Sequence, residues 1–248
     1  MQIQDWHQQG GTLKETLGLT TNPVGLYRTD HETAGADMTK TRICRAIMDA
    51  AAGKDITLCK TNNACFGAVW HLGFHKIKDP EILNMTKKFV VEGEKLFSSY
   101  EALDKLIAQM GAVPDHEKTC FRLMPLTQID RTPELVLVLG NAEQVCRLLT
   151  LVTFVDGIMP KIKIGGPTCR MAVVNPLLTG EVNVSFYDYT ARKICHVPPD
   201  QLLVSIPAKS LPSIIKSIPA CTAGTAKIEY PQDFKQFLQK RQQGAKKH

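Results

Sequence analysis

The sequence predicts an α+β fold, a single globular unit covering residues 1–248. Two observations predict it. Apolar runs such as Leu135-Val-Leu-Val-Leu139 are typical of strands buried on both faces. Elsewhere apolar residues recur at helical spacing, as Leu13 and Leu17 do. Both kinds of segment occur along the chain, and no linker rich in Ser, Gly or Pro divides it. We therefore expect one domain.

Each expected element has a local reason. The helix predicted over 39–52 ends at Gly53, and Pro80 suits a first helical turn. Ser98 with Glu101 forms a capping-box pattern, and Asn141 is a good N-cap. The predicted strands are 23–28, 55–59, 119–126, 134–139, 159–164, 181–187 and 201–206, and the predicted helices are 8–19, 39–52, one from Pro80, one after Ser98, 142–154, 208–218 and 231–242.

Two stretches, 22–75 and 134–180, resemble one another. Each reads as a strand, a helix with a Cys-Arg pair, a second strand, and a loop cysteine leading into an apolar segment. The two halves of the fold are therefore predicted to be related strand–helix–strand–helix units. Pseudo-two-fold symmetry would bring their matching loops towards one place.

Composition and charge limit the classes of function that the sequence can support. The chain has a net charge of +6 and is 44% hydrophobic, with basic and acidic residues interspersed. The terminal helix and basic tail, 231–248, hold a cluster (Lys235, Lys240, Arg241, Lys246, Lys247), for which a solvated surface is a better explanation than nucleic-acid contact. We find no 18-residue apolar stretch or secretion signal, so we expect a cytoplasmic protein without a membrane span.

The cysteines carry the chemical signal. In the absence of a secretion signal we expect all 8 to be reduced, and they form no Cys-x-x-Cys pair. Any metal site must therefore be assembled by the fold. Cys65 and Cys169 each precede a predicted helix, whose N-terminus favours thiolate. Cys44 lies inside its predicted helix between Arg42 and Arg45, so we expect one neighbouring guanidinium to favour the thiolate there too. The other candidates for simple packing are Cys59, Cys120, Cys146 and Cys221.

Over most of its length the chain resembles the family known as domain of unknown function 169. The resemblance rests on Cys44 with Ala46 and Gly53, on Ala64-Cys65-x-Gly67, on Gly140-Asn141 with Gln144 and Arg147, on Gly166 and Cys169, on Pro176 with Thr179-Gly180-Glu181, on Asn183-Val184-Ser185, and on Leu202 to Pro207. Family members often carry Gly-Cys-x-Gly-x-Arg after the Asn-Val-Ser segment. This chain has Asp188 at the cysteine position and keeps Arg192.

The resemblance thus implies a site of Cys44, Cys65 and Cys169 with Asp188 in place of a fourth thiolate, although Cys195 or Cys59 can also supply one. Four cysteines complete a cubane iron–sulfur cluster, and three with a carboxylate still bind one. The first hypothesis is therefore an iron–sulfur or other thiolate metal protein with a redox or ligand-activating role. It requires the three sulfur atoms to lie within roughly 7 Å of each other.

Two other hypotheses remain open. One is a cofactor-free binding protein for a small anionic metabolite, with a pocket at Asn63, Gly166, Tyr189 and Arg192, near Tyr187. The other is an enzyme with a cysteine nucleophile. A zinc site at His71 and His75 is disfavoured because no Glu stands beside His71. The expected partner is a small molecule or a redox protein; the sequence does not indicate an oligomeric state.

Overall fold

The computed structural model describes residues 2–30, 36–74, 80–111, 114–116 and 118–245. The strands are β1 (Val24–Thr29), β2 (Ile56–Leu58), β3 (Cys120–Pro125), β4 (Leu135–Gly140), β5 (Asn183–Ser185) and β6 (Leu202–Pro207). The helices are α1 (Ile3–Leu17), α2 (Ile43–Ala51), α3 (Phe66–His71), α4 (Pro80–Lys88), α5 (Tyr100–Met110), α6 (Ala142–Thr153), α7 (Asn175–Thr179), α8 (Tyr189–Cys195), α9 (Leu211–Ser217), α10 (Thr222–Thr225) and α11 (Gln232–Ala245). Single turns of 3-10 helix, η2 (Leu126–Gln128) and η4 (Ala208–Ser210), and π-helical segments, η1 (Phe89–Gly93) and η3 (Arg170–Val174), complete them.

The described strands form one six-stranded antiparallel sheet in the order β2-β3-β1-β4-β6-β5. The central strand β4 is buried along its whole length. Its side chains alternate between two cores, because Leu135, Leu137 and Leu139 join one cluster while Val136 and Val138 join the other. The uninterrupted apolar run in the sequence is thus explained by helices covering both faces of the sheet.

Each face has its own helical layer. One face packs against α2, α3, η3 and α8, and the other against α1, α6, α9 and α10. The N-terminus of α6 has the capping box expected from Asn141, whose side chain accepts from Gln144 while the Gln144 side chain accepts from the Asn141 N–H. The candidate site lies in the first of these layers.

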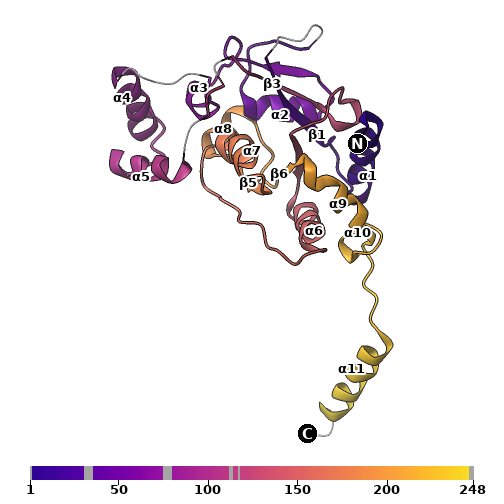
Figure 1. Ribbon diagram of the computed structural model, residues 1–248. Coiled ribbons are helices and arrows are strands. Elements are labelled where there is room, and N and C mark those ends of the chain that lie inside the picture. Colours follow the sequence, from indigo (N-terminus) through magenta and orange to yellow (C-terminus); the bar gives the residue numbers. More distant parts are fainter. Residues whose placement is uncertain (1, 31–35, 75–79, 112–113, 117, 246–248) are drawn as a thin grey trace.

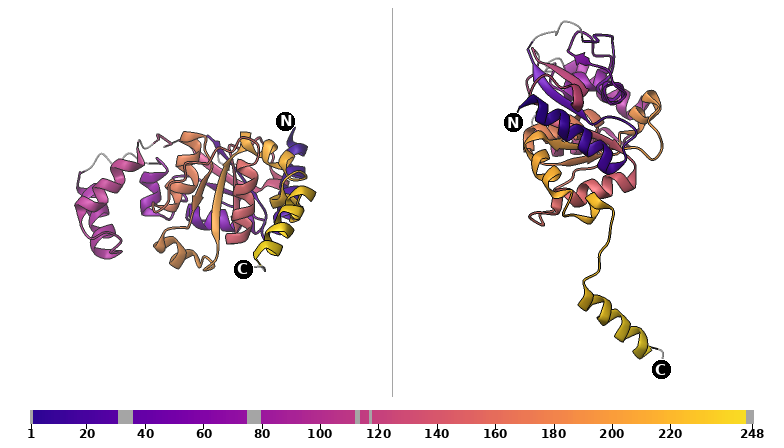
Figure 2. Two further views of the ribbon diagram at one scale, coloured as in Figure 1. Left: turned by 90° about the horizontal axis from the view of Figure 1, so that it is seen from below. Right: turned by 90° about the vertical axis from the view of Figure 1, so that its right-hand side faces the viewer.

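Two helical segments project from the body. The pair α4 and α5, joined through η1, stands beside α3 at one end of the molecule (Figure 1); we call residues 80–110 the arm. Away from the arm, α11 follows an extended linker and is separated from the sheet in Figure 1 and in the right-hand view of Figure 2. None of the helices in the described part of the chain is both long and apolar enough to cross a membrane.

The α+β prediction is confirmed, but the structure does not show the two related halves. Residues 159–164, all of them described, contain no strand, so that prediction was wrong. Moreover, α2 and α6 lie on opposite faces of the sheet. A two-fold axis relating the antiparallel neighbours β1 and β4 would leave both helices on the same face. The N-cap of α5 is Ser99 rather than the expected Ser98, and the Ser99 side chain accepts a hydrogen bond from the Ala102 N–H.

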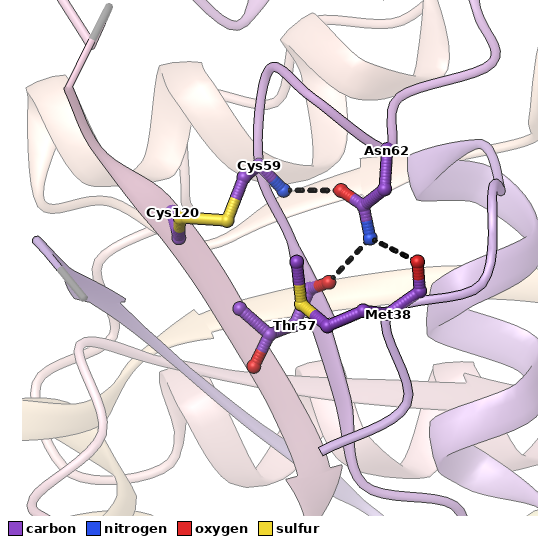
Figure 3. The surroundings of a disulfide bond; sticks show 5 residues. All are labelled: Met38, Thr57, Cys59, Asn62 and Cys120. Carbon is purple, nitrogen blue, oxygen red and sulfur yellow. Dashed lines mark hydrogen bonds between the residues drawn. A yellow bond between two sulfur atoms is a disulfide. The ribbon is translucent and has the colours of Figure 1, made fainter. Parts of the chain in front are cut away.

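A disulfide joins Cys59, after β2, to Cys120 at the start of β3 (Figure 3). The expectation that every cysteine is reduced was therefore wrong for this pair. Beside it the buried Asn62 side chain accepts from the Cys59 N–H at 2.7 Å and donates to the carbonyls of Thr57 and Met38. These bonds fix the loop that leads from β2 to Cys65.

Candidate functional site

A cavity of about 580 Å³ lies between the arm and the helical layer that contains α2, α3 and α8. Its volume is within the range of small-molecule sites. Four cysteines line it, from four segments of the chain: Cys44, Cys65, Cys169 and Cys195. None of them is in a disulfide. Thus the structure brings the three cysteines singled out in the sequence to one cavity, with a fourth beside them.

Cys44 occupies the first turn of α2 and is 7% exposed. Burial raises the pKa of its thiol well above the ordinary value, and the nearby Cys169 and Asp188 raise it further. The expected stabilisation of a thiolate by the flanking arginines is not seen. Arg45 instead pairs with Asp49 at 2.8 Å, one turn along the helix.

Cys65 is the N-cap of α3, as the sequence predicted. Its Sγ accepts a hydrogen bond from the Ala68 N–H at 3.4 Å. The Asn63 side chain accepts from the Cys65 N–H and donates to the Cys65 carbonyl, which fixes the backbone at this residue. Asn63 therefore orients Cys65 but does not line the cavity.

Cys169 is the N-cap of η3 and is almost fully buried. Of the two preceding glycines, Gly165 has a backbone conformation that favours glycine, and Gly166 lies against the flexible end of a methionine side chain. Gly165 has φ +95°, and a Cβ at Gly166 would lie 2.4 Å from Cε of Met171. Burial raises the pKa of the Cys169 thiol, and Cys65 raises it further. Desolvation outweighs the helix terminus here, contrary to the sequence-based expectation.

Asp188 lines the cavity, but its carboxylate is already engaged. Oδ1 accepts from the Ala191 N–H and caps α8, while Oδ2 accepts from the N–H and the hydroxyl of Thr168. The Thr168 hydroxyl in turn accepts from the Asp188 N–H. We call this set of bonds the Asp188–Thr168 contact. It ties the segment of Cys169 to the helix of Cys195.

Cys195 ends α8 and is 2% exposed. The pKa of its thiol is raised by burial, against the opposing effect of Arg42 and Arg45. Sequence analysis named Cys195 only as a substitute ligand, because no local motif surrounds it. The other substitute, Cys59, cannot supply a thiolate ligand because its sulfur is bonded in a disulfide.

Sequence analysis gave little weight to two further side chains that line the cavity. Burial, with Arg170 nearby, lowers the pKa of His71 to about 4, so its imidazole is neutral at physiological pH. The zinc pairing with His75 falls on a residue outside the described part of the chain. Tyr187 is 5% exposed and has φ +59°, an unusual value for a residue with a side chain.

The residues predicted to form an anion pocket do not all line the cavity. Gly166 and Tyr189 line the cavity, whereas Arg192 does not. The Arg192 guanidinium donates to four backbone carbonyls, those of Phe186, Pro198, Pro199 and Gln201. It therefore closes the loop that follows α8 and has its terminal nitrogens engaged.

Among the described residues, no three His, Cys, Asp or Glu side chains already converge as the ligands of one metal ion. A cluster separates its ligands more widely than a single ion does. The sulfur atoms of a cubane cluster lie roughly 6–7 Å apart, with iron–sulfur bonds of about 2.3 Å. Whether the four cysteines hold such a cluster stays a prediction.

Comparison with known proteins supports the resemblance seen in the sequence. The model of the family domain of unknown function 169, described as uncharacterised ArCR, matches residues 12–217. The chain therefore belongs to this family. No curated protein and no solved structure matches it.

Proposed function

We propose that this member of the family holds an iron–sulfur cluster, or a related thiolate-bound metal centre, in the cavity beneath the arm. The ligands are Cys44, Cys65 and Cys169, with Cys195 as the fourth. The observation that supports the proposal is the arrival of four free cysteines, from α2, α3, η3 and α8, at one cavity. Simple packing does not require four separate segments to place thiols at the same cavity.

The fourth ligand is better supplied by Cys195 than by Asp188. Each oxygen of the Asp188 carboxylate already accepts at least one hydrogen bond, so coordination to iron would compete with the capping of α8. A thiolate is also the softer ligand and suits a sulfur-rich iron site. Asp188 then acts as a positioning residue that keeps the Cys169 and Cys195 segments together.

The metal would relieve a specific electrostatic cost. Beyond the effect of burial, Cys169 raises the pKa of the Cys44 thiol and Cys65 raises that of Cys169, which disfavours neighbouring thiolates without a cation. Metal binding to deprotonated sulfur replaces this repulsion by attraction. A bound cluster would supply one-electron redox chemistry or a Lewis-acidic iron for a small ligand. The alternative of an anionic-metabolite site is less well supported, because both terminal nitrogens of Arg192 donate to backbone carbonyls and Arg192 does not line the cavity.

The test is iron and sulfide content after anaerobic purification and reconstitution, together with visible absorption. Serine at any of the four cysteine positions should lower the iron content strongly. Cys146→Ser and Cys221→Ser are matched controls, because Cys146 is exposed on α6 and Cys221 belongs to the core on the opposite face of the sheet. Equal iron content in all six variants and the wild type would refute the proposal.

A further inference from the structure

One face of α11 carries four apolar side chains that the body of the protein does not cover. Phe234, Phe237 and Leu238 recur at helical spacing, and Phe237 is 52% exposed. The ring of Tyr230, just before the helix, stacks on Phe234, which in turn stacks on Phe237. Residues 225–241 are all exposed, so nothing in the described part of the chain shields these rings. We call the four side chains the apolar stripe.

Basic side chains accompany the apolar stripe. At about 100° per residue, Lys235 and Lys240 fall on either side of it, and glutamines occupy the opposite face. The Arg241 guanidinium lies over the Phe237 ring, 5.8 Å from its centroid. Residues 231–248 contain five basic residues and one acidic residue, and so carry +4 of the net charge of +6. The stripe therefore belongs to the most basic part of the chain.

A second exposed apolar segment lies near the start of the linker to α11. It is the loop that follows α6, residues 154–163, which we call the α6 loop. Ile158 is 67% exposed and Met159 is 81% exposed, and Lys161 and Lys163 follow them. The linker leaves from α10, which packs against α6. The α6 loop and α10 both lie at the lower edge of the body in Figure 1 and in the right-hand view of Figure 2.

We propose that the protein binds the surface of an anionic phospholipid bilayer through the apolar stripe and the α6 loop. The helix would lie in the plane of the bilayer, with its rings between the headgroups and the acyl chains. Lysines on both flanks of the stripe can then extend to the lipid phosphates. The net charge of +4 selects an anionic surface over a neutral one.

A flat partner fits the two surfaces better than a groove does. The apolar stripe and the α6 loop are separate, and each combines exposed apolar side chains with lysines. A groove on another protein accommodates one helix face, whereas a bilayer is wide enough to meet both surfaces at the same edge of the body. The inference is independent of the proposed metal centre, because no residue of the stripe or of the α6 loop lines the cavity.

The test is co-sedimentation of the full chain with vesicles. One set contains phosphatidylcholine and phosphatidylserine in equal parts, and the other contains phosphatidylcholine alone. We expect binding to the first set, much weaker binding to the second, and a fall in affinity as salt is added, because salt screens the attraction between lysines and lipid.

The apolar part of the contact is tested by Phe234→Gln combined with Phe237→Gln. Glutamine favours a helix at least as well as phenylalanine, so α11 is retained. Loss of two rings from the bilayer should weaken binding at least about 10-fold. The matched control is Ile82→Gln combined with Met85→Gln, which removes two exposed apolar side chains from the arm and should leave binding unchanged.

The charged part is tested by Lys235→Gln combined with Lys240→Gln. Binding to the anionic vesicles should fall about 20-fold, since each basic residue near such a surface contributes about fivefold. Lys88→Gln combined with Lys105→Gln is the control. It makes the same change in net charge at two exposed lysines of the arm and should have little effect.

Ile158→Gln combined with Met159→Gln should weaken binding about fivefold, and wild-type affinity in this variant would refute a contact through both surfaces. Equal binding to the two kinds of vesicle, or wild-type binding by either α11 variant, would overturn the inference. So would a lipid-free dimer that the phenylalanine variant converts to a monomer, or tighter binding to duplex DNA than to anionic vesicles at the same salt concentration. Iron content should be unchanged in all these variants, so loss of vesicle binding and failure of the metal centre are measured separately.

Discussion

Replacement of Asp188 by alanine removes the whole Asp188–Thr168 contact on the carboxylate side. Three hydrogen bonds are lost, from the Ala191 N–H at 2.8 Å and from the Thr168 N–H and hydroxyl at 2.9 and 2.8 Å. Bonds to a charged group contribute about 1.5–3 kcal/mol each, and an N-cap about 1 kcal/mol. Because the carboxylate is partly exposed and the three bonds are not independent, we expect a loss of ~3 kcal/mol.

The loss is measured as the free energy of unfolding in urea, together with the thermal midpoint, which should fall by roughly 6–12 °C in a chain of this length. Asp188→Asn keeps one oxygen as the acceptor for Ala191 but presents an amide nitrogen to Thr168, so an intermediate loss is expected. Asp200→Ala is the control, because Asp200 is exposed in the loop after α8. A loss below about 1 kcal/mol would refute the structural role of the contact.

The same variants separate positioning from ligation. If Asp188 orients the cysteines, Asp188→Cys also loses the cap of α8 and should retain no more iron than the wild type after exposure to air. If the carboxylate is itself a ligand, as the family pattern implies, the added thiolate should make the cluster more resistant to oxygen. Iron retained per chain over time decides between the two roles.

Two other predictions concern stability. Removing the Cys59–Cys120 disulfide by a double alanine substitution should lower the free energy of unfolding by about 4 kcal/mol, since the bond closes a loop with a sequence separation of 61 residues. The control in the same urea titration is Cys146→Ala, which changes an exposed free thiol. An equal loss of stability in both variants would contradict this reasoning. Burial raises the pKa of Glu134, but the side-chain and backbone hydrogen bonds from Arg28 outweigh this effect and leave the pKa of Glu134 lowered. Ionised Glu134 therefore contributes stability above the ordinary glutamate pKa, and this contribution is lost as the pH falls through the pKa of the folded state. Glu134→Gln should therefore flatten the fall in the urea midpoint below neutral pH, whereas Glu181→Gln, at an exposed residue, should follow the wild-type curve.

Much of the secondary structure could be predicted from local sequence. The strand β4 and the cap at Asn141 each depend only on residues that are close together in the sequence. The strand predicted at 159–164 failed because its alternating Lys and Ile residues satisfy a local pattern but have no neighbouring strand to pair with. The structure does not show the apparent repeat, for a related reason. Similar strings of residues do not fix which face of a sheet a helix will cover.

The sequence by itself determined the mixed fold and the family, and it singled out three cysteines, two of them where a helix was predicted to begin. It could do so because turn residues, caps and apolar periodicity act over a few positions. Only the tertiary structure decided which thiols share a cavity. It paired Cys59 with Cys120, brought Cys195 to the wall beside Cys44, and engaged Arg192 with carbonyls. It also reversed the expected pKa shifts of Cys44 and Cys169, since desolvation depends on all the atoms that pack around a thiol and not on its neighbours in the chain.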